Sequence, residues 1–359
     1  MKKIAFFIGS LAFGGAERAI SNLANAMDSY GNKVYMITSY EGEMAYQLSE
    51  GITFKALLPR RKASFIQNNF AQVKELRQLC KTWKIDLLVS FMAEPNFRAV
   101  AATVGLPTKT IISVRSDPNI EYAGFLNKML AKTLLVTADG CVFQTEDAKK
   151  WFPKKLQKKS MVIFNDVKET FFNTEWNPDE QQAVAVGRLD PAKNYPIMIE
   201  SFAAIIKKFP DAKLCIYGSG PEETSIQQLI TEKHLQNNIF LKGITNNVPE
   251  VLSHASVFIM TSDYEGMPNA LMEALAVGVP CVSTDCPCGG PRALIQSGYN
   301  GYLASVGDSK DIASCVINIL ENKQTAKEMS VNAKKDSLKF RPEKISNIWK
   351  DYFNNILNS

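Results

Sequence analysis

The chain has 359 residues, of which 46% are hydrophobic and 21% are charged, and its net charge is +5. This length accommodates two domains of ordinary size, and the composition excludes a disordered or fibrous protein. Since no segment reaches the roughly 18 uninterrupted apolar residues of a membrane-spanning helix, the sequence predicts no membrane span.

The amino terminus begins like a secretory signal, with two lysines followed by an apolar run. That run covers only about seven residues and leads directly into a glycine-rich turn, so a first β-strand is the better interpretation. Seven scattered cysteines and two histidines, His234 and His254, indicate reduced thiols rather than disulfides or a zinc site. We therefore expect a cytoplasmic protein.

Basic residues cluster twice in the amino-terminal half. Arg60, Arg61 and Lys62 form one group, and six lysines between Lys149 and Lys159 form the other. A solvated surface is the default interpretation of such runs. Contact with the anionic inner surface of the cell membrane is the alternative, because each basic residue near lipid contributes about 1 kcal/mol. No nucleic acid partner is expected, since aromatic residues are not interleaved with the lysines.

Apolar runs alternate with helix-length amphipathic segments along the chain, a pattern typical of parallel βαβ units. The strands predicted in the first half are 4–8, 34–38, 85–91, 110–114, 141–144 and 161–164. Those predicted in the second half are 183–186, 213–217, 239–241, 257–261 and 280–284. Polar sequence between the halves, at 168–182, predicts a linker.

This pattern predicts an α/β protein with two Rossmann-like domains that face a cleft, formed by residues 1–167 and 183–341. Ligands of such sheets bind beyond the carboxyl ends of the strands. The last segment, 342–359, places apolar side chains such as Trp349 and Phe353 on one helical stripe. A helix of this kind must pack on something, and we expect it to cross back to the first domain.

The segment from Ser262 to Pro280 carries the strongest functional signal. Pro268 suits the first position of a helix, and the helix that follows is apolar on every side except at Glu273. A buried carboxylate needs hydrogen-bond donors, which the two hydroxyls of a ribose would supply. Glu265 lies just before this helix, whose positive end favours an anion such as a diphosphate.

Two other interpretations of this glutamate pair remain open. Glu273 pairs with a core arginine while Glu265 caps the helix, which the spacing alone would favour. Alternatively, the two residues form the acid/base pair of a glycosidase. That chemistry uses carboxyl groups about 5–9.5 Å apart, whereas a continuous helix over 265–273 would rise about 12 Å. The loop at Gly266 interrupts such a helix and so weakens this distance argument against a glycosidase pair.

Two cations follow the first strand of the second half. Arg188 and Lys193, in a loop that begins at Gly187, are suited to clamp a diphosphate at the carboxyl end of that strand. Two solvated cations on a surface loop are the plainer alternative. Gly218 and Gly220 end the next strand, where backbone N–H groups meet a phosphate or a base edge, although a tight turn explains these glycines equally well.

Gly14 and Gly15 lie between the first predicted strand and the first helix. The segment matches neither a GxGxxG fingerprint nor a P-loop, because no Gly-Lys-Ser/Thr follows. A glycine pair at a helix start would still allow the backbone to contact a phosphate or a sugar.

Together these motifs resemble glycosyltransferase family 4, retaining enzymes of the GT-B fold with two facing Rossmann-like domains. The similarity runs nearly end to end. It implies that Arg188 and Lys193 neutralise the donor diphosphate without a metal or other cofactor, that Glu273 holds the ribose, and that Glu265 lies by the donor sugar or phosphate. The donor contacts implied in addition are Gly14, Gly15, Gly187, Gly218, Gly220, Gly266, Met267, Asn269, Gly289 and Gly290.

The chain departs from the family pattern at two places. Arg115 and Asp117 lie in a segment where many relatives carry a histidine near the reacting sugar, and Ala293 stands where a glutamate is common. The expected catalytic residues are Glu265, Arg188, Lys193, Arg115 and Asp117.

The resemblance implies transfer of a hexose or N-acetylhexosamine from a UDP-sugar to a hydroxyl of a lipid-linked glycan, in bacterial surface polysaccharide synthesis. The stretch 60–83 is a candidate surface for docking to the inner membrane, and a plain amphipathic helix packed on the sheet is equally compatible with its pattern. The rival functions are a UDP-sugar epimerase of similar architecture and a catalytically silent glycan-binding subunit. The intact set of Arg188, Lys193, Glu265 and Glu273 argues against the silent subunit.

Overall fold

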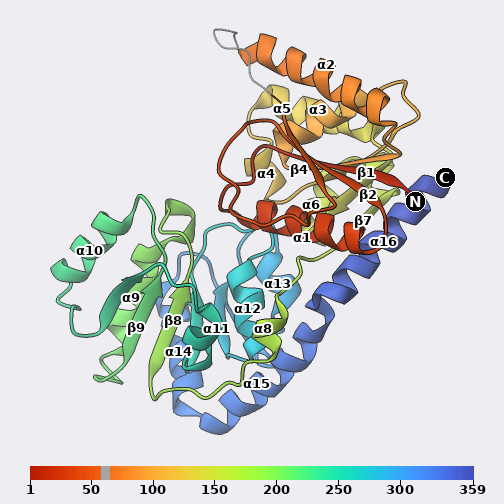
Figure 1. Cartoon of the computed structure of the whole chain (residues 1–359). Coiled ribbons are helices and arrows are strands. Elements are labelled where there is room, and N and C mark those ends of the chain that lie inside the picture. Colours follow the sequence, from red (N-terminus) through yellow and green to blue (C-terminus); the bar gives the residue numbers. More distant parts are fainter. Residues whose placement is uncertain (58–64) are drawn as a thin grey trace. The chain divides into compact units, whose positions relative to one another are not determined.

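The structure, a computed structural model, describes residues 1–57 and 65–359 (Figure 1). The chain divides into two compact units. Met1–Asp166 and Glu343–Ser359 form the first unit, and Val167–Pro342 form the second. Arg60, Arg61 and Lys62 lie outside the described residues, as does the start of the stretch 60–83 predicted to dock on a membrane.

The first unit is built on a parallel sheet. Its strands are β1 (Lys3–Ile8), β2 (Lys33–Thr38), β3 (Thr53–Ala56), β4 (Leu87–Phe91), β5 (Lys109–Ser113), β6 (Gly140–Phe143) and β7 (Ser160–Val162). Among the described residues they follow the order β3-β2-β1-β4-β5-β6-β7, and every pairing is parallel. All five residues of β4 are buried, which explains why the central strands are continuously apolar in sequence.

Helices connect these strands and cover the sheet (Figure 1). They are α1 (Gly15–Ser29), α2 (Phe65–Trp83), α3 (Ala93–Thr103), α4 (Pro118–Glu121), α5 (Phe125–Thr133), α6 (Glu146–Trp151) and α7 (Lys154–Gln157), with a 3₁₀ turn η1 (Leu135–Thr137). The edge strand β3 was missed by the sequence analysis because Thr53 and Phe54 are exposed, so that it lacks the apolar run of a central strand.

The final helix α16 (Pro342–Asn358) closes the core of the first unit. The ring of Trp349 stacks on Phe91 with centroids 5.9 Å apart. Tyr352 lies at the start of β6, where its hydroxyl accepts a 2.9 Å hydrogen bond from the N–H of Cys141 and donates a 2.6 Å bond to the carbonyl of Lys159. The last residues of the chain thus complete a unit that the first residues begin.

The second unit holds a second parallel sheet. Its strands are β8 (Gln182–Val186), β9 (Lys213–Tyr217), β10 (Ile239–Gly243), β11 (Val257–Met260), β12 (Cys281–Thr284) and β13 (Gly301–Ala304). Within the described part of the chain their order is β10-β9-β8-β11-β12-β13. The predicted fold class of two parallel α/β domains is therefore confirmed. β13 was not predicted, because it is a short strand with two half-buried residues.

The helical elements of the second unit are α8 (Glu169–Phe172), η2 (Pro191–Lys193), α9 (Tyr195–Ile205), α10 (Glu223–Glu232), α11 (Val248–Ser253), α12 (Asn269–Val277), α13 (Gly290–Leu294), α14 (Ser309–Glu321), α15 (Lys323–Ser337) and η3 (Leu338–Phe340). The helix α12 begins at Asn269, so Pro268, predicted as suited to the first helical position, is its N-cap instead. None of the described helices is long and apolar enough to cross a membrane.

Residues 168–182, predicted as an interdomain linker, lie within the second unit instead. The helix α8 buries Phe171 and Phe172, and the indole N–H of Trp176 donates a 2.7 Å hydrogen bond to the carbonyl of Ala255. The polar residues around these aromatic side chains gave the segment the composition of a linker, although its aromatic side chains are packed in the second unit. The two units divide between Asp166 and Val167.

The buried hydroxyl of Tyr352 generates a stability prediction. Tyr352→Phe leaves the N–H of Cys141 and the carbonyl of Lys159 without this partner, so we expect the free energy of unfolding to fall by about 1–3 kcal/mol. Equilibrium urea denaturation measures the change. Tyr40→Phe is the matched control, because the Tyr40 side chain is 42% exposed. Equal stability of the two variants would contradict the assigned role.

Candidate active site

Four neighbouring strands of the second unit, β9, β8, β11 and β12, end at the same edge of their sheet. The loops that leave them begin at Gly218, Gly187, Thr261 and Asp285. Because parallel strands point the same way, their carboxyl ends meet at one edge. The structure therefore brings together the second-unit residues that were predicted to bind the donor.

Lys193 and Glu265 form the central ion pair of this edge. The ammonium of Lys193 contacts Oε1 of Glu265, and the hydroxyl of Ser262 donates a 2.8 Å hydrogen bond to the same oxygen. The side chains of Lys193 and Glu265 are only 26% and 13% exposed. Ser262 was not predicted as a site residue, although its position directly after a strand and three residues before Glu265 was a usable signal.

The backbone holds Glu265 in place from both sides. Its N–H donates a 2.7 Å bond to the carbonyl of Pro287, and its carbonyl accepts a 3.0 Å bond from the N–H of Cys288. The loop after β11 is thus tied to the loop after β12. A carboxylate on a loop fixed in this way is preorganised for a ligand.

The loop that carries Lys193 is held equally firmly. The hydroxyl of Thr261 donates bonds of 2.9 and 3.1 Å to the carbonyls of Lys193 and Asn194. The side-chain amide of Asn194 donates a 2.8 Å bond to the carboxylate of Asp263. Asn194 adopts a left-handed conformation and also caps α9. The turn that carries Lys193 is therefore also the start of this helix.

Arg188 is an exposed cation at this edge, with 72% of its side chain accessible. Its Nε lies 3.2 Å from Oδ2 of Asp190, while Oδ1 of Asp190 is buried and has no hydrogen-bond partner among the described residues. The guanidinium therefore keeps most of its donors turned to solvent, where an anionic ligand can reach them.

Gly218 and Gly220 lie where two loops touch. A Cβ on Gly218 would come within 1.8 Å of the carbonyl oxygen of Gly187, and one on Gly220 would come within 2.3 Å of the carbonyl of Leu189. Gly218 also has a φ of +145°. These glycines are required by the close approach of the loops after β8 and β9. The structural explanation considered from sequence was a tight turn. The N–H of Gly218 donates a 2.9 Å hydrogen bond to the carbonyl of Gly243.

Glu273 lies in the middle of the buried helix α12 and is 6% exposed, as its apolar surroundings predicted. Met267, just before the helix, is 6% exposed, and Asn269 is its first residue. Gly290 approaches this helix start so closely that a Cβ would lie 1.9 Å from the carbonyl of Gly266. Gly289 precedes it with a φ of +79°.

In the first unit the predicted glycine pair is part of a polar turn. The hydroxyl of Tyr46 donates a 2.9 Å bond to the carbonyl of Gly14 and accepts a 3.2 Å bond from its N–H. A Cβ on Gly14 would lie 2.1 Å from the carboxylate of Glu17. Burial raises the pKa of Glu17, partly offset by a backbone hydrogen bond and by Arg115. Gly15 is the first residue of α1.

Arg115 follows β5 and faces several acidic groups. Its guanidinium lies 4.4 Å above the ring of Phe91 and donates to the side chain of Asn165, while its Nε has no hydrogen-bond partner among the described residues. Burial lowers its pKa to about 10, opposed by the charges of Glu121, Asp166 and Glu17. Arg115 thus belongs to a buried polar cluster rather than to a solvated surface.

Asp117 has a structural role in addition to any chemical one. Its carboxylate accepts a 2.8 Å bond from the N–H of Asn119 and caps α4. Glu121, which the sequence analysis missed, accepts bonds of 2.9 Å from the N–H groups of Arg115 and Ser116. Burial raises the pKa of Glu121 to about 7, despite these two donors and Arg115.

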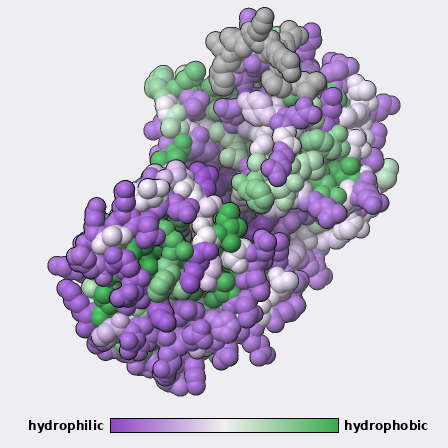
Figure 2. Space-filling view, turned by 60° about the vertical axis from the view of Figure 1, so that its left-hand side comes forward, coloured by the Kyte–Doolittle hydropathy of each residue, from purple (hydrophilic) through white to green (hydrophobic). Residues whose placement is uncertain are grey.

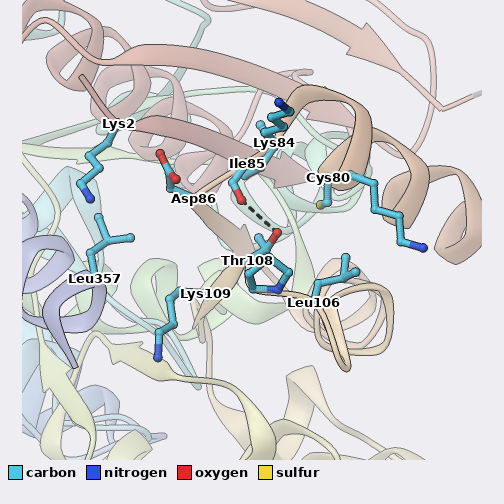
Figure 3. Close-up of a pocket in the computed structure, with 11 residues that line it drawn as sticks. Lys2, Cys80, Lys84, Ile85, Asp86, Leu106, Thr108, Lys109 and Leu357 are labelled. Carbon is cyan, nitrogen blue, oxygen red and sulfur yellow. Dashed lines mark hydrogen bonds between the residues drawn. The ribbon is translucent and has the colours of Figure 1, made fainter.

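Each of the two units has a hollow among its described residues. One of about 440 Å³ lies where the strands of the first sheet begin; it is lined by Lys2, Asp86, Thr108, Lys109 and Leu357 among others (Figure 3). Its lining contains none of the predicted site residues. The other, of about 980 Å³, lies along α10 and includes Gly220.

Comparison with known families supports the assignment of both units. Residues 13–168 match the model described as Glycosyltransferase Family 4, and residues 166–336 match the model described as Glycosyl transferases group 1. The two matches meet at the division between the units and span most of the chain.

Individual proteins are similar over nearly the whole length. An uncharacterized glycosyltransferase of Haemophilus influenzae is 27% identical over 353 residues, 98% of this chain and 99% of the relative. An undecaprenol-PP-linked glycan alpha-1,4-N-acetyl-D-galactosaminyltransferase of Campylobacter jejuni is 27% identical over 357 residues, 97% of each. The crystal structure of HepE from Anabaena in complex with UDP has a TM-score of 0.86 at 18% identity, covering 99% of this chain and 100% of that one, which shows a common GT-B fold.

Gly218→Ala tests the contact between the loops after β8 and β9. We expect the free energy of unfolding to fall by about 2–4 kcal/mol. The new Cβ would overlap the carbonyl of Gly187, and alanine would also be strained by the positive φ of residue 218. Thermal unfolding measures the loss. Gly298→Ala is the matched control, since Gly298 has a φ of +83° but a Cβ there would meet nothing within 4 Å. A similar loss in both variants would show that the contact is unimportant.

Glu121 predicts a pH dependence of stability. The pKa of Glu121 in the folded protein is raised from 4.5 to about 7. Its contribution to the free energy of unfolding is therefore fully present below pH 4.5 and is lost as the pH rises through 7. Relative to Glu121→Gln, the wild type should therefore lose about 1–3 kcal/mol of unfolding free energy between pH 5 and 8. Urea denaturation across this pH range measures the difference, and a constant difference would refute the raised pKa.

Proposed function

This chain belongs to the GT-B glycosyltransferases that combine a family 4 domain with a group 1 domain, and from this premise we propose that it transfers a hexose or N-acetylhexosamine from a UDP-sugar to a glycan hydroxyl. The observation that carries the proposal is the edge of the second sheet. Lys193 and Glu265 are paired there, Arg188 lies on the loop that leaves β8, and the buried Glu273 lies in α12, the helix that follows the loop of Glu265. Solved structures of HepE from Anabaena contain UDP or UDP-glucose, which supports a uridine nucleotide as the donor.

The two cations would neutralise the departing diphosphate. When the bond from the anomeric carbon to the phosphate oxygen breaks, its electron pair stays on that oxygen and UDP leaves with additional negative charge. A planar guanidinium and an ammonium on preorganised loops stabilise this charge without reorganisation of solvent. In the free protein Lys193 is paired with Glu265, so donor binding would exchange this contact for one with phosphate.

The glutamates would have separate roles. Glu273, in the buried helix α12, would accept hydrogen bonds from the ribose hydroxyls. Glu265 would lie beside the donor sugar or its phosphate, in a position set by the backbone bonds to Pro287 and Cys288. The backbone at Gly187, Gly218, Gly220, Gly266, Met267, Asn269, Gly289 and Gly290 would complete the donor site.

We further propose that the anomeric configuration is retained and that Arg188 and Lys193 take the place of a divalent metal. The family 4 domain supports retention, and the two cations at the strand ends support charge neutralisation by the protein itself. Rate acceleration would come mainly from placing the acceptor and stabilising the leaving group.

The acceptor would be a lipid-linked glycan of a bacterial surface polysaccharide. Two Campylobacter jejuni relatives are named for acceptors linked to undecaprenol through a diphosphate. In the first unit Gly14 and Gly15, between β1 and α1, would contact the donor, and Arg115 and Asp117, which follow the carboxyl end of β5, would act near the reacting sugar. A lipid-linked acceptor would bring the protein to the anionic inner face of the cell membrane, from the cytoplasmic side.

Binding of UDP tests the donor site directly. We expect UDP to raise the melting temperature in the presence of EDTA, and Arg188→Ala to weaken UDP binding by about 10–100-fold, because charge-assisted hydrogen bonds are lost. Thermal shift against UDP concentration measures both. Lys310→Ala, at an exposed lysine of the same unit, is the control and should bind UDP normally.

Turnover distinguishes the proposal from its rivals. Incubation of UDP-sugars with a lipid-linked acceptor should give a product of unchanged anomeric configuration by NMR. A sugar epimerised without an acceptor would indicate an epimerase, and UDP binding without transfer to any acceptor would indicate a silent subunit. No stabilisation by any nucleotide would overturn the donor site itself.

A further inference from the structure

The helix α5 of the first unit carries an apolar face that is open to solvent in the described structure. Phe125, Leu126 and Met129 are 85%, 60% and 44% exposed, and Ala131 is the buried residue of this helix. Met129 follows Leu126 by three residues and Phe125 by four, and residues at these spacings lie on one side of a helix, so the three side chains form a common face. Single exposed apolar residues are ordinary, whereas a contiguous group marks an interaction surface.

The helices around this face concentrate the positive charge of the chain. Residues 118–159 contain eight lysines and four acidic residues, a net charge of +4, whereas the whole chain carries +5. Figure 2 shows that, on one face of the molecule, hydrophobic patches interrupt a mostly hydrophilic surface. An apolar face bordered by lysines has the chemistry of a surface that binds anionic lipid.

Direct contacts join these helices into one surface. The ammonium of Lys132 on α5 lies 4.6 Å from the ring centre of Trp151 on α6. The indole N–H of Trp151 donates a 2.9 Å bond to Asn119 on α4. The ammonium of Lys159, just after α7, donates a 2.8 Å bond to the carbonyl of Val136 in the turn that follows α5. These contacts hold α5 and the turn that follows it against a lysine-rich segment of the chain.

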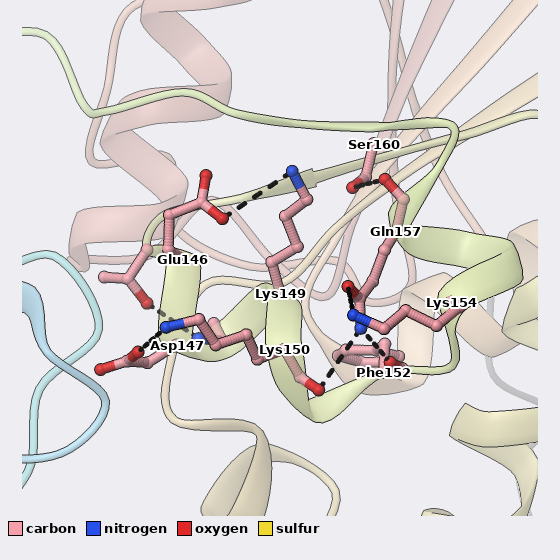
Figure 4. A network of polar contacts seen from close by, with 10 residues as sticks. Glu146, Asp147, Lys149, Lys150, Phe152, Lys154, Gln157 and Ser160 are labelled. Carbon is pink, nitrogen blue, oxygen red and sulfur yellow. Dashed lines mark hydrogen bonds and ion pairs between the residues drawn. The ribbon is translucent and has the colours of Figure 1, made fainter.

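Only some of these lysines are neutralised locally. Figure 4 shows Lys149 paired with Glu146 and Lys150 with Asp147, at 3.8 and 3.1 Å. Lys128, Lys155 and Lys158 are exposed, and no ion pair or side-chain hydrogen bond joins them to another described residue. Their charge is available to a partner.

We propose that this surface, Phe125, Leu126 and Met129 with the lysines of α5–α7, docks the protein on a bilayer of anionic phospholipid. The apolar side chains would enter the headgroup region while the lysines contact lipid phosphates. The inference rests on the proposed function, because a lipid-linked acceptor requires the enzyme at a membrane. Asp117, a proposed catalytic residue, caps α4 and so begins the same segment of chain.

This surface differs from the one expected from sequence. The stretch 60–83 was selected for its basic start, which lies outside the described residues. Its helix α2 exposes Phe70 by 74%, but the basic residue in its last turn is Lys81 alone. The lysine cluster at 149–159 was noted in the sequence, whereas the apolar face of α5 becomes evident only from its exposure.

Vesicle sedimentation tests the proposal on the full chain. The wild type should bind vesicles of phosphatidylglycerol and phosphatidylcholine more tightly than vesicles of phosphatidylcholine alone, and added salt should weaken the binding. The variant Phe125→Ser/Leu126→Ser/Met129→Ser should lose about tenfold in partitioning, since its apolar contacts are removed. Phe70→Ser is the matched control and should bind like the wild type.

The contribution of charge is tested with a matched pair. Lys128→Glu should reduce binding to anionic vesicles by about tenfold, because one attractive contact becomes repulsive. Lys310→Glu changes the net charge equally, but in the second unit, and should have little effect. Equal losses from both substitutions would show a response to net charge alone and would overturn the proposed surface.

The melting temperature with UDP, recorded for every variant, separates this inference from the proposed function. Loss of vesicle binding with an unchanged UDP-induced shift supports the docking surface. A wild type that responds to UDP but ignores anionic vesicles overturns the surface and leaves the donor site intact. A wild type that forms a dimer abolished by the triple substitution, without binding vesicles, identifies a second copy of the chain as the partner instead. A wild type that does not respond to UDP sinks the proposed function, whatever the vesicles show.

Discussion

The parallel direction of the strands is the constraint on which the rest of this structure depends. In the second unit it brings the ends of β9, β8, β11 and β12 to one edge, so that residues nearly 80 positions apart, such as Arg188 and Glu265, lie on loops that leave the same edge. The loops can converge only because residue 218 has no side chain, since its Cβ would overlap the carbonyl of Gly187. The close packing of two loops therefore requires glycine at this position.

Charge is handled differently in the two units. At the sheet edge of the second unit, Lys193 is neutralised by Glu265, while Arg188 remains largely exposed. In the first unit, Arg115 and Glu121 are buried. Burial lowers the pKa of Arg115 and raises the pKa of Glu121, which favours the neutral form of each side chain. The first arrangement suits an incoming anion that replaces an internal partner. The second holds a cation in a polar cluster with fixed neighbours.

Much of the fold was predictable because central parallel strands are apolar on both faces and leave a continuous signal in the sequence. The misses occur where this reasoning does not apply. The strand β3 is exposed at an edge, and β13 is short and half-buried. Residues 168–182 have the composition of a linker, yet the burial of Phe171 and Phe172 makes them part of the second unit.

The sequence by itself determined the class of fold, because central parallel strands leave continuous apolar runs, and it singled out a lone glutamate in an apolar helix and two cations after a strand. Only the tertiary structure decided which of these groups touch. It paired Lys193 with Glu265, added Ser262 to that pair, and turned Asp117 into a helix cap beside the unpredicted Glu121. It also showed that the apolar face of α5 is accessible to solvent. Local patterns record what a side chain is, whereas contacts between distant segments and exposure to solvent depend on how the elements pack.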